Sequence, residues 1–212
     1  MLIKVLTSSS SSRRSVLILG LSESGKTRLF VRLVFQKCVD TVTSMSPNEG
    51  DVKIGKRLIH VIDCPGYDRL RMKQLEDHKS KCKGIIFLLD SLAFLSNNRH
   101  VGDFLYTVLS DPVVSKRRLP ILIACNKQDE PKSKSCKVIA KQLEREINAI
   151  RETRIAALDS IDSNDQNRII LGNPSRDFTW NDLKNPIDFV DCSAKSDDDN
   201  SIESVGIWLR KI

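Results

Sequence analysis

The 212-residue chain has few aromatic residues, 5% of the sequence, and no dense arginine block. Proteins that bind nucleic acid by stacking its bases need aromatic side chains interleaved with cations. The net charge is +7, and the densest basic stretch, Arg69 to Lys83, carries six bases and two acids. We therefore expect no direct nucleic-acid contact. We interpret the stretch as a solvated helix face, with a surface near anionic lipid as the functional alternative.

The six cysteines also lack paired spacing, and no Cys-x-x-Cys occurs. This absence argues against a structural zinc site and against a redox motif. Cys64, Cys125 and Cys192 fall in or beside the ends of apolar runs. We expect them to be small buried hydrophobes in a reducing compartment.

No apolar run approaches the roughly 20 residues of a membrane span. The chain starts with Met-Leu rather than Met-Gly, which excludes N-myristoylation of this terminus, and its end, WLRKI, has no cysteine for prenylation. We expect the chain as written to carry no membrane anchor of its own.

The organisation along the chain is that of one domain. Residues 1–14 contain a serine run and two arginines and are predicted to be a flexible linker, or the stub of an upstream anchor. Residues 15–212 form the predicted domain. Its segment 158–180 is polar and loop-like, and we interpret it as an insertion before the last strand.

Short apolar runs alternate with helical patterns from residue 15 onward. Strands are expected at 15–20, 57–63, 84–90, 120–126 and 186–191, and helices at 27–36, 69–82, 99–110, 134–156 and 201–212. In the first helix, Arg28 and Arg32 are expected to point outward. This alternation predicts an α/β fold with a mainly parallel sheet, taken as six-stranded, flanked by helices.

The run GLSESGKT fits the phosphate-binding pattern G-x-x-x-x-G-K-[ST] without a mismatch, between a predicted strand and a predicted helix. Backbone N–H groups of such a loop surround phosphate oxygens, the lysine reaches the β- and γ-phosphates, and the threonine hydroxyl reaches Mg²⁺. The predicted phosphate-binding residues are Gly20, Ser22, Glu23, Ser24, Gly25, Lys26 and Thr27.

A second motif, Asp63-Cys64-Pro65-Gly66, follows the next apolar strand. We expect Asp63 to hold Mg²⁺, through water, and the Gly66 N–H to bond the γ-phosphate. The motif is weak alone, and its place after the phosphate loop strengthens it.

Two further motifs follow later strands in order. Asn126-Lys127-Gln128-Asp129 suits guanine, because the Asp129 carboxylate can accept from the ring N1–H and the exocyclic amine. Asn126 would fix the loop, and the Lys127 stem would cover one ring face. In Ser193-Ala194-Lys195, the Ala194 N–H would bond the guanine carbonyl and Lys195 would cover the base. Ligands of such sheets bind at these carboxyl strand ends.

Together these motifs resemble those of the small GTPases, from Ser15 onward. A closer resemblance is to the β subunits of the signal recognition particle receptor, carried by GLSESGKTRLFVRLV, DCPGYDRLRMKQLE, DFLYTVL, IACNKQD and DCSAK. It implies a GTP-binding regulatory subunit that uses GTP and Mg²⁺. It also implies GTP-dependent binding of the receptor α subunit through the switch regions, in co-translational targeting to the endoplasmic reticulum membrane. Members carry an N-terminal transmembrane anchor, and the nucleotide domain lies on the cytosolic face.

Two switch positions are less regular. Thr41 and Thr43 are candidates for the hydroxyl that reaches Mg²⁺ and the γ-phosphate, and the resemblance favours Thr43. Tyr67 stands where related GTPases carry Gln or His to position the attacking water. A tyrosine hydroxyl with a pKa near 10 is a poor base at neutral pH. No arginine closely precedes Thr43, so we predict slow or partner-stimulated GTPase activity.

The motifs leave two alternatives open. One is an Arf/Sar-type vesicle-trafficking GTPase, against which the Met-Leu start and the long insertion count. The other is a structural module that holds GTP permanently. The four motifs fit all three functions equally, so they cannot separate them.

Overall fold

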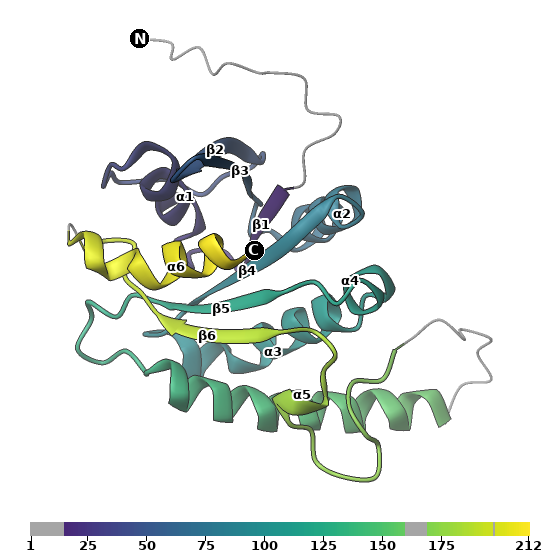
Figure 1. The fold of residues 1–212 in the computed structure, drawn as a ribbon. Coiled ribbons are helices and arrows are strands. Elements are labelled where there is room, and N and C mark those ends of the chain that lie inside the picture. The colour runs from purple at the N-terminus through teal and green to yellow at the C-terminus, as the bar shows by residue number, and fades with distance from the viewer. Residues whose placement is uncertain (1–14, 160–168, 197) are drawn as a thin grey trace.

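The computed structural model describes residues 15–159, 169–196 and 198–212, so the linker predicted at 1–14 lies outside the described residues. The strands are β1 (Ser15–Leu19), β2 (Asn48–Ile54), β3 (Arg57–Asp63), β4 (Cys82–Asp90), β5 (Ile121–Asn126) and β6 (Ile187–Asp191). They form one sheet in the order β2-β3-β1-β4-β5-β6 (Figure 1). All neighbours are parallel except β2 and β3.

The α-helices are α1 (Lys26–Phe35), α2 (Asp68–His78), α3 (Phe94–Leu109), α4 (Pro112–Lys116), α5 (Cys136–Asp159) and α6 (Glu203–Lys211). Two 3-10 turns, Trp180–Asp182 and Asp199–Ile202, complete the described elements. None of the helices in the described ranges is long and apolar enough to cross a bilayer.

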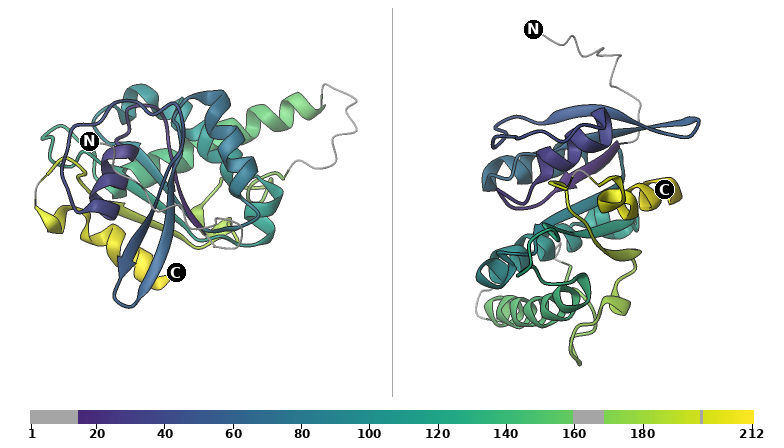
Figure 2. Two further views of the ribbon diagram at one scale, coloured as in Figure 1. Left: turned by 90° about the horizontal axis from the view of Figure 1, so that it is seen from above. Right: turned by 90° about the vertical axis from the view of Figure 1, so that its left-hand side faces the viewer.

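Alternating side chains of β1 divide the core into two layers. Leu17 and Leu19 pack with apolar residues of α2, α3 and α5 on one face of the sheet. Val16 and Ile18 pack with residues of α1 and α6 on the other. Figure 2 shows these layers from two further sides. Because both faces are covered, β1 and β5 are buried at every position, as their continuous apolar runs predict.

The fold confirms the predicted α/β class with a mainly parallel, six-stranded sheet. The sixth strand is β2, which our strand ranges missed, and it begins shortly after the switch candidates Thr41 and Thr43. The sequence NEGDVKI has no apolar run because β2 is an edge strand in which only Val52 is buried. The short helix α4 was also missed.

The buried cysteines match the prediction. Cys64, Cys125 and Cys192 are all buried, and all six cysteines are free thiols. Cys64 and Cys192 follow strand ends directly, where a small side chain fits beneath the loops. They therefore behave as packing residues.

The described part of segment 158–180 begins inside α5 and resumes at residue 169. Arg151, which is 3% exposed on α5, fixes this returning segment. Its guanidinium donates to the carbonyl oxygens of Asn173 at 2.9 Å and Arg176 at 2.6 Å. Leu171 and Phe178 of the same segment are buried in the core. One charged side chain therefore joins the segment before β6 to the domain.

Replacing Arg151 with alanine should lower the free energy of unfolding by about 2 to 3 kcal/mol, because two carbonyl groups lose a charged donor. The measurement is urea denaturation of both proteins. The control Arg145→Ala, at an exposed position of α5, should change stability by less than about 0.5 kcal/mol. Equal effects of the two substitutions would contradict this function of Arg151.

Candidate functional site

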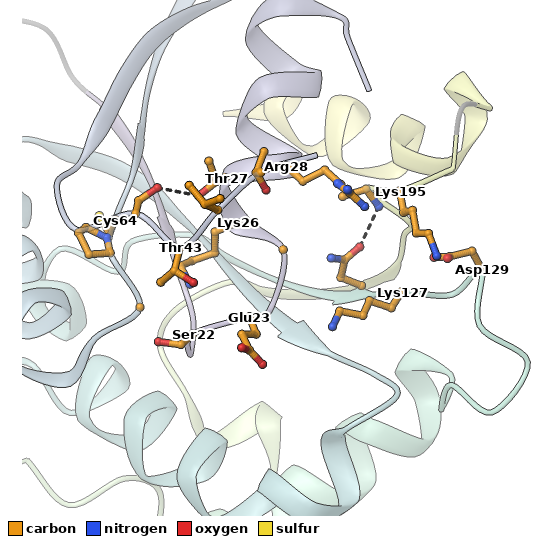
Figure 3. A pocket seen from close by; sticks show the side chains of 18 of the residues that line it. Ser22, Glu23, Lys26, Thr27, Arg28, Thr43, Cys64, Lys127, Asp129 and Lys195 are labelled. Carbon is orange, nitrogen blue, oxygen red and sulfur yellow. Dashed lines mark hydrogen bonds between the residues drawn. The ribbon is translucent and has the colours of Figure 1, made fainter. Parts of the chain in front are cut away.

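A cavity of about 550 Å³ opens where β1, β3, β5 and β6 end. Figure 3 shows Lys26, Thr27 and Thr43 toward one end, and Lys127, Asp129 and Lys195 toward the other. The predicted residues in its wall are Ser22, Glu23, Gly25, Lys26, Thr27, Thr43, Gly66, Asn126, Lys127, Asp129, Ala194 and Lys195. The structure thus gathers residues from four separate motifs around one cavity.

The predicted phosphate loop connects β1 to α1 and depends on two glycines. Gly20 has φ +150°, and a Cβ there would lie 2.1 Å from the carbonyl oxygen of Leu88. Gly25 has φ +92°, and a Cβ there would lie 2.3 Å from Nδ2 of Asn126. Any side chain at either position would displace the loop. Ser24, between them, is buried behind the cavity wall.

Lys26, the first residue of α1, is 6% exposed. Its Nζ donates to the carbonyl oxygen of Leu21 at 2.6 Å and contacts Oγ of Ser24 at 3.5 Å, and both acceptors are neutral. Burial lowers the pKa of this ammonium group to about 8, although the Asp63 carboxylate opposes the shift. An anionic ligand at this end of the cavity would compensate the buried charge.

Asp63 ends β3 directly beneath the phosphate loop and is fully buried. Its Oδ2 accepts from Oγ1 of Thr27 at 2.8 Å and from Nδ2 of Asn48 at 2.9 Å. Its Oδ1 is buried and has no hydrogen-bond partner among the described residues. Burial raises the pKa of the carboxyl group. An unpaired carboxylate oxygen next to a hydroxyl group is a donor set that fits a divalent cation.

Two polar residues of this cluster were not predicted. Ser44 Oγ lies 3.0 Å from Thr27 Oγ1, and Asn48 Nδ2 donates to Ser44 Oγ at 3.1 Å. Thr41 and Thr43 both line the cavity, so the structure adds a third hydroxyl to the two candidates. Asn48 pairs with Asp63 across β2 and β3. Recognising β2 in the sequence would have placed Asn48 opposite Asp63, but β2 has no apolar run that reveals it.

Gly66 packs against the phosphate loop, whereas the side chain of its neighbour Tyr67 faces a different cavity. A Cβ on Gly66 would be 2.6 Å from the backbone nitrogen of Ser22, so this backbone packs directly on the phosphate loop. Tyr67 precedes α2, is 61% exposed, and lines a neighbouring cavity together with Arg71 and His100. It is not among the described residues that line the main cavity, so its side chain is poorly placed to orient a water there.

At the opposite end, Asn126 holds two loops together. Its Nδ2 donates to the carbonyl oxygen of Ser24 at 2.7 Å, and its Oδ1 accepts from the Ala194 N–H at 2.8 Å. Ser193 donates through Oγ to Oδ1 of Asp129 at 2.5 Å. The Asp129 carboxylate is thereby fixed at the cavity edge by a residue of another motif.

The two lysines beside Asp129 are each held by an acid. Lys127 has φ +67°, and its Nζ lies 2.6 Å from Oδ2 of Asp90. Lys195 Nζ lies 3.5 Å from Oε1 of Glu130. Both side chains are thus held at the cavity wall, where their stems can cover a flat ring.

The expectation that Arg32 points outward was wrong. Arg32 is 5% exposed, and its guanidinium donates to the carbonyl oxygens of Ser193 at 3.0 Å and Asp198 at 3.1 Å. It therefore joins α1 to the loop after β6. Its spacing on α1 looked solvent-facing because the loop that covers it comes from the far end of the chain. Arg28 is half-buried and lines the cavity.

The strand order and the loops around this cavity define a domain of the small-GTPase class. The chain belongs to the signal recognition particle receptor beta subunit family, whose model matches residues 11–187. The mouse signal recognition particle receptor subunit beta is 38% identical over 216 aligned positions, which cover 99% of this chain and 80% of the mouse protein. The human subunit is 39% identical with the same coverage.

Solved structures agree with this assignment. The mammalian signal recognition particle receptor has a TM-score of 0.81 at 37% identity, covering 93% of this chain and 99% of that chain. The Chaetomium thermophilum SRb-GTP/SRX complex has a TM-score of 0.73 at 23% identity and shows the fold alone, covering 95% and 99% of the two chains. The family match favours the receptor family over the Arf/Sar alternative.

The lowered pKa of Lys26 predicts a pH-dependent contribution to stability. The folded pKa of about 8 lies below the ordinary 10.5, so the charged form costs stability below pH 8. That cost disappears as the pH rises from about 8 to 10.5. In nucleotide-free protein, wild type should gain up to about 3 kcal/mol of unfolding free energy relative to Lys26→Met across this range.

The comparison with Lys26→Met cancels the titration of the buried thiols, which both proteins share. Urea denaturation at several pH values measures the difference. Lys132→Met, at an exposed position, is the control and should show no such trend. A difference between wild type and Lys26→Met that is constant with pH would contradict the prediction.

Proposed function

We propose that this chain binds GTP with Mg²⁺ as the regulatory subunit of a signal recognition particle receptor. The observation that carries the proposal is the polarity of the cavity. One end is lined by the buried Lys26 and by Thr27, behind which Asp63 keeps an unpaired carboxylate oxygen, and the other has the Asp129 carboxylate fixed by Ser193. Triphosphate with Mg²⁺ suits the first end, and guanine suits the second.

The residues divide into three groups. Backbone groups of the loop from Gly20 to Thr27, with the Lys26 ammonium, would bind phosphates, and the Gly66 N–H would bond the terminal phosphate. Thr27 and Asp63 would hold Mg²⁺, with a switch hydroxyl from Thr43 or Ser44. The metal would neutralise phosphate charge. Asn126, Lys127, Asp129, Ser193, Ala194 and Lys195 would form the guanine end.

Family membership supports the receptor function. The relatives are named as receptor β subunits, and the solved complex from Chaetomium thermophilum contains SRX. We infer that GTP-loaded protein binds the receptor α subunit through the segments around Thr43 and Gly66. We place it at the endoplasmic reticulum membrane, with this domain on the cytosolic face, in co-translational protein targeting.

Asp129→Asn tests base recognition and partner binding together. An asparagine amide cannot accept from both guanine donors, but it can donate to the extra carbonyl of xanthine. GTP affinity should fall about 100-fold or more, and xanthosine triphosphate should bind instead. Isothermal titration calorimetry measures both affinities.

The wild-type protein should then bind the receptor α subunit when loaded with GTP, and Asp129→Asn should bind it when loaded with xanthosine triphosphate. Asp188→Asn, at an exposed position of β6, should behave as wild type. Unchanged nucleotide preference in Asp129→Asn would contradict the base site. Capture that ignores the nucleotide would contradict the regulatory function.

Intrinsic hydrolysis should be slow, because Tyr67 is exposed and lines a different cavity. In a single-turnover assay without partner, the rate should be about 10³-fold or more below that of GTPases stimulated by an activating protein. Tyr67→Phe should leave the rate unchanged, because the hydroxyl has no part in the reaction. A fast rate, or a clear loss of rate in Tyr67→Phe, would contradict this.

A further inference from the structure

The end of the sheet opposite the cavity carries a concentration of positive charge. The parallel strands begin there, and α2, α3 and α6 end there. In Figure 1, β5 and β6 run from right to left, so their amino ends face right, where α4 also lies; the turn of the β2–β3 hairpin points down in the left view of Figure 2, beside the C-terminus. We call this the amino-end surface and define it by residues 55–58, 78–83, 110–120, 183–187 and 209–212.

These segments hold eleven lysines and arginines and a single acid, Asp111. The bases are Lys56, Arg57, Lys79, Lys81, Lys83, Lys116, Arg117, Arg118, Lys184, Arg210 and Lys211. The one acid is already paired, because its Oδ2 lies 2.8 Å from Nζ of Lys79. By contrast, the loops at the cavity end mix the acids Glu23, Asp40, Asp68, Asp129, Glu130 and Asp198 with the bases Lys37, Arg69, Lys127, Lys132, Lys134 and Lys195. The excess of positive charge is therefore greater at the amino-end surface.

Hydrogen bonds between the segments hold this surface in shape. Arg117 donates to the carbonyl oxygens of Lys79 at 2.8 Å and Ser80 at 2.7 Å. Asn185 donates to those of Val114 at 3.0 Å and Leu119 at 2.9 Å. These contacts join three of the segments.

The β2–β3 turn is fixed to α6 in the same way, because Arg57 donates to the carbonyl oxygen of Arg210 at 2.7 Å. The cations thus stand on a preformed surface rather than on a disordered tail.

The neighbouring apolar group indicates the kind of partner. Leu58 follows Lys56 and Arg57 and is 64% exposed. The five segments contain no Phe, Trp or Tyr. An exposed leucine beside two cations suits a bilayer interface, whereas single-stranded nucleic acid is usually bound on aromatic platforms. Clusters of four to eight lysines and arginines beside a membrane attract anionic lipids.

The path of the chain supports the same orientation. The N–H of Ser15, the first residue of β1, donates to the carbonyl oxygen of Lys81 at 3.4 Å. The described chain therefore begins at the amino-end surface. A membrane attachment through that end of the chain would bring the surface to the bilayer and leave the cavity facing away from it.

We propose that the amino-end surface docks on a bilayer containing anionic lipids and orients the nucleotide site away from the membrane. The choice of a membrane over other polyanions rests on the proposed receptor function. The binding itself needs no nucleotide.

The test is co-sedimentation of the full 212-residue chain with vesicles of about 80% phosphatidylcholine and about 20% phosphatidylserine, at about 0.15 M salt. The triple variant Lys56→Glu, Lys116→Glu, Lys184→Glu reverses one exposed charge on each of three segments. Its partition onto these vesicles should fall about tenfold or more. Leu58→Ser should weaken binding further, and pure phosphatidylcholine vesicles should bind little.

The matched control is Lys132→Glu, Lys137→Glu, Lys141→Glu, which makes the same change in net charge at exposed positions toward the cavity end. It should bind vesicles nearly as wild type does. Equal loss in both triple variants would overturn the proposal, because net charge alone would then explain binding. The proposal would also be overturned if the Lys56→Glu, Lys116→Glu, Lys184→Glu variant lost binding to a single-stranded RNA but still bound the vesicles as wild type does.

Nucleotide affinity, measured separately on both triple variants, should match wild type. A triple variant that keeps its nucleotide affinity but no longer binds vesicles has lost the function of the amino-end surface and not that of the nucleotide site. The assay also works without nucleotide, so a chain that bound no GTP could still confirm or overturn membrane docking.

Discussion

Asn126 is the side chain on which the geometry of the cavity depends. Its amide binds the phosphate loop through the Ser24 carbonyl and the last loop through the Ala194 N–H. It also fills the space beside Gly25, where any Cβ would lie 2.3 Å away. One buried amide, 2% exposed, therefore sets the separation between the predicted phosphate and base ends. Both of its polar atoms are satisfied, which is why it can be buried at little cost.

The phosphate end is built differently, because its charges are incompletely compensated. Lys26 is buried against neutral oxygens, and Asp63 keeps one carboxylate oxygen without a partner among the described residues. Burying such groups costs free energy, which an anion and a cation placed between them would recover. The cavity therefore suits a ligand that combines an anion, for Lys26, with a cation, for Asp63. This is the pattern expected when binding, rather than folding, determines the residues.

Local patterns in the sequence predicted most of the residues that the structure gathers around this cavity. The four motifs sit at strand ends, and the topology of a parallel sheet brings strand ends together, so their convergence followed from order alone. The failures share a different cause. Arg32, Ser44 and Asn48 act through partners 161, 17 and 15 residues away. Periodicity places a residue on a face but cannot say which distant segment covers that face. An edge strand such as β2 has too little buried surface to leave a pattern.

The β2–β3 hairpin connects the two proposed binding regions. Its open end holds Asn48 opposite Asp63 at the cavity, and its turn carries Lys56, Arg57 and Leu58 at the amino-end surface. Because side chains alternate along a strand, the pairing register fixes both ends together. The antiparallel edge of the sheet, which left the weakest signal in the sequence, therefore contributes residues both to the polar cluster beside the cavity and to the amino-end surface.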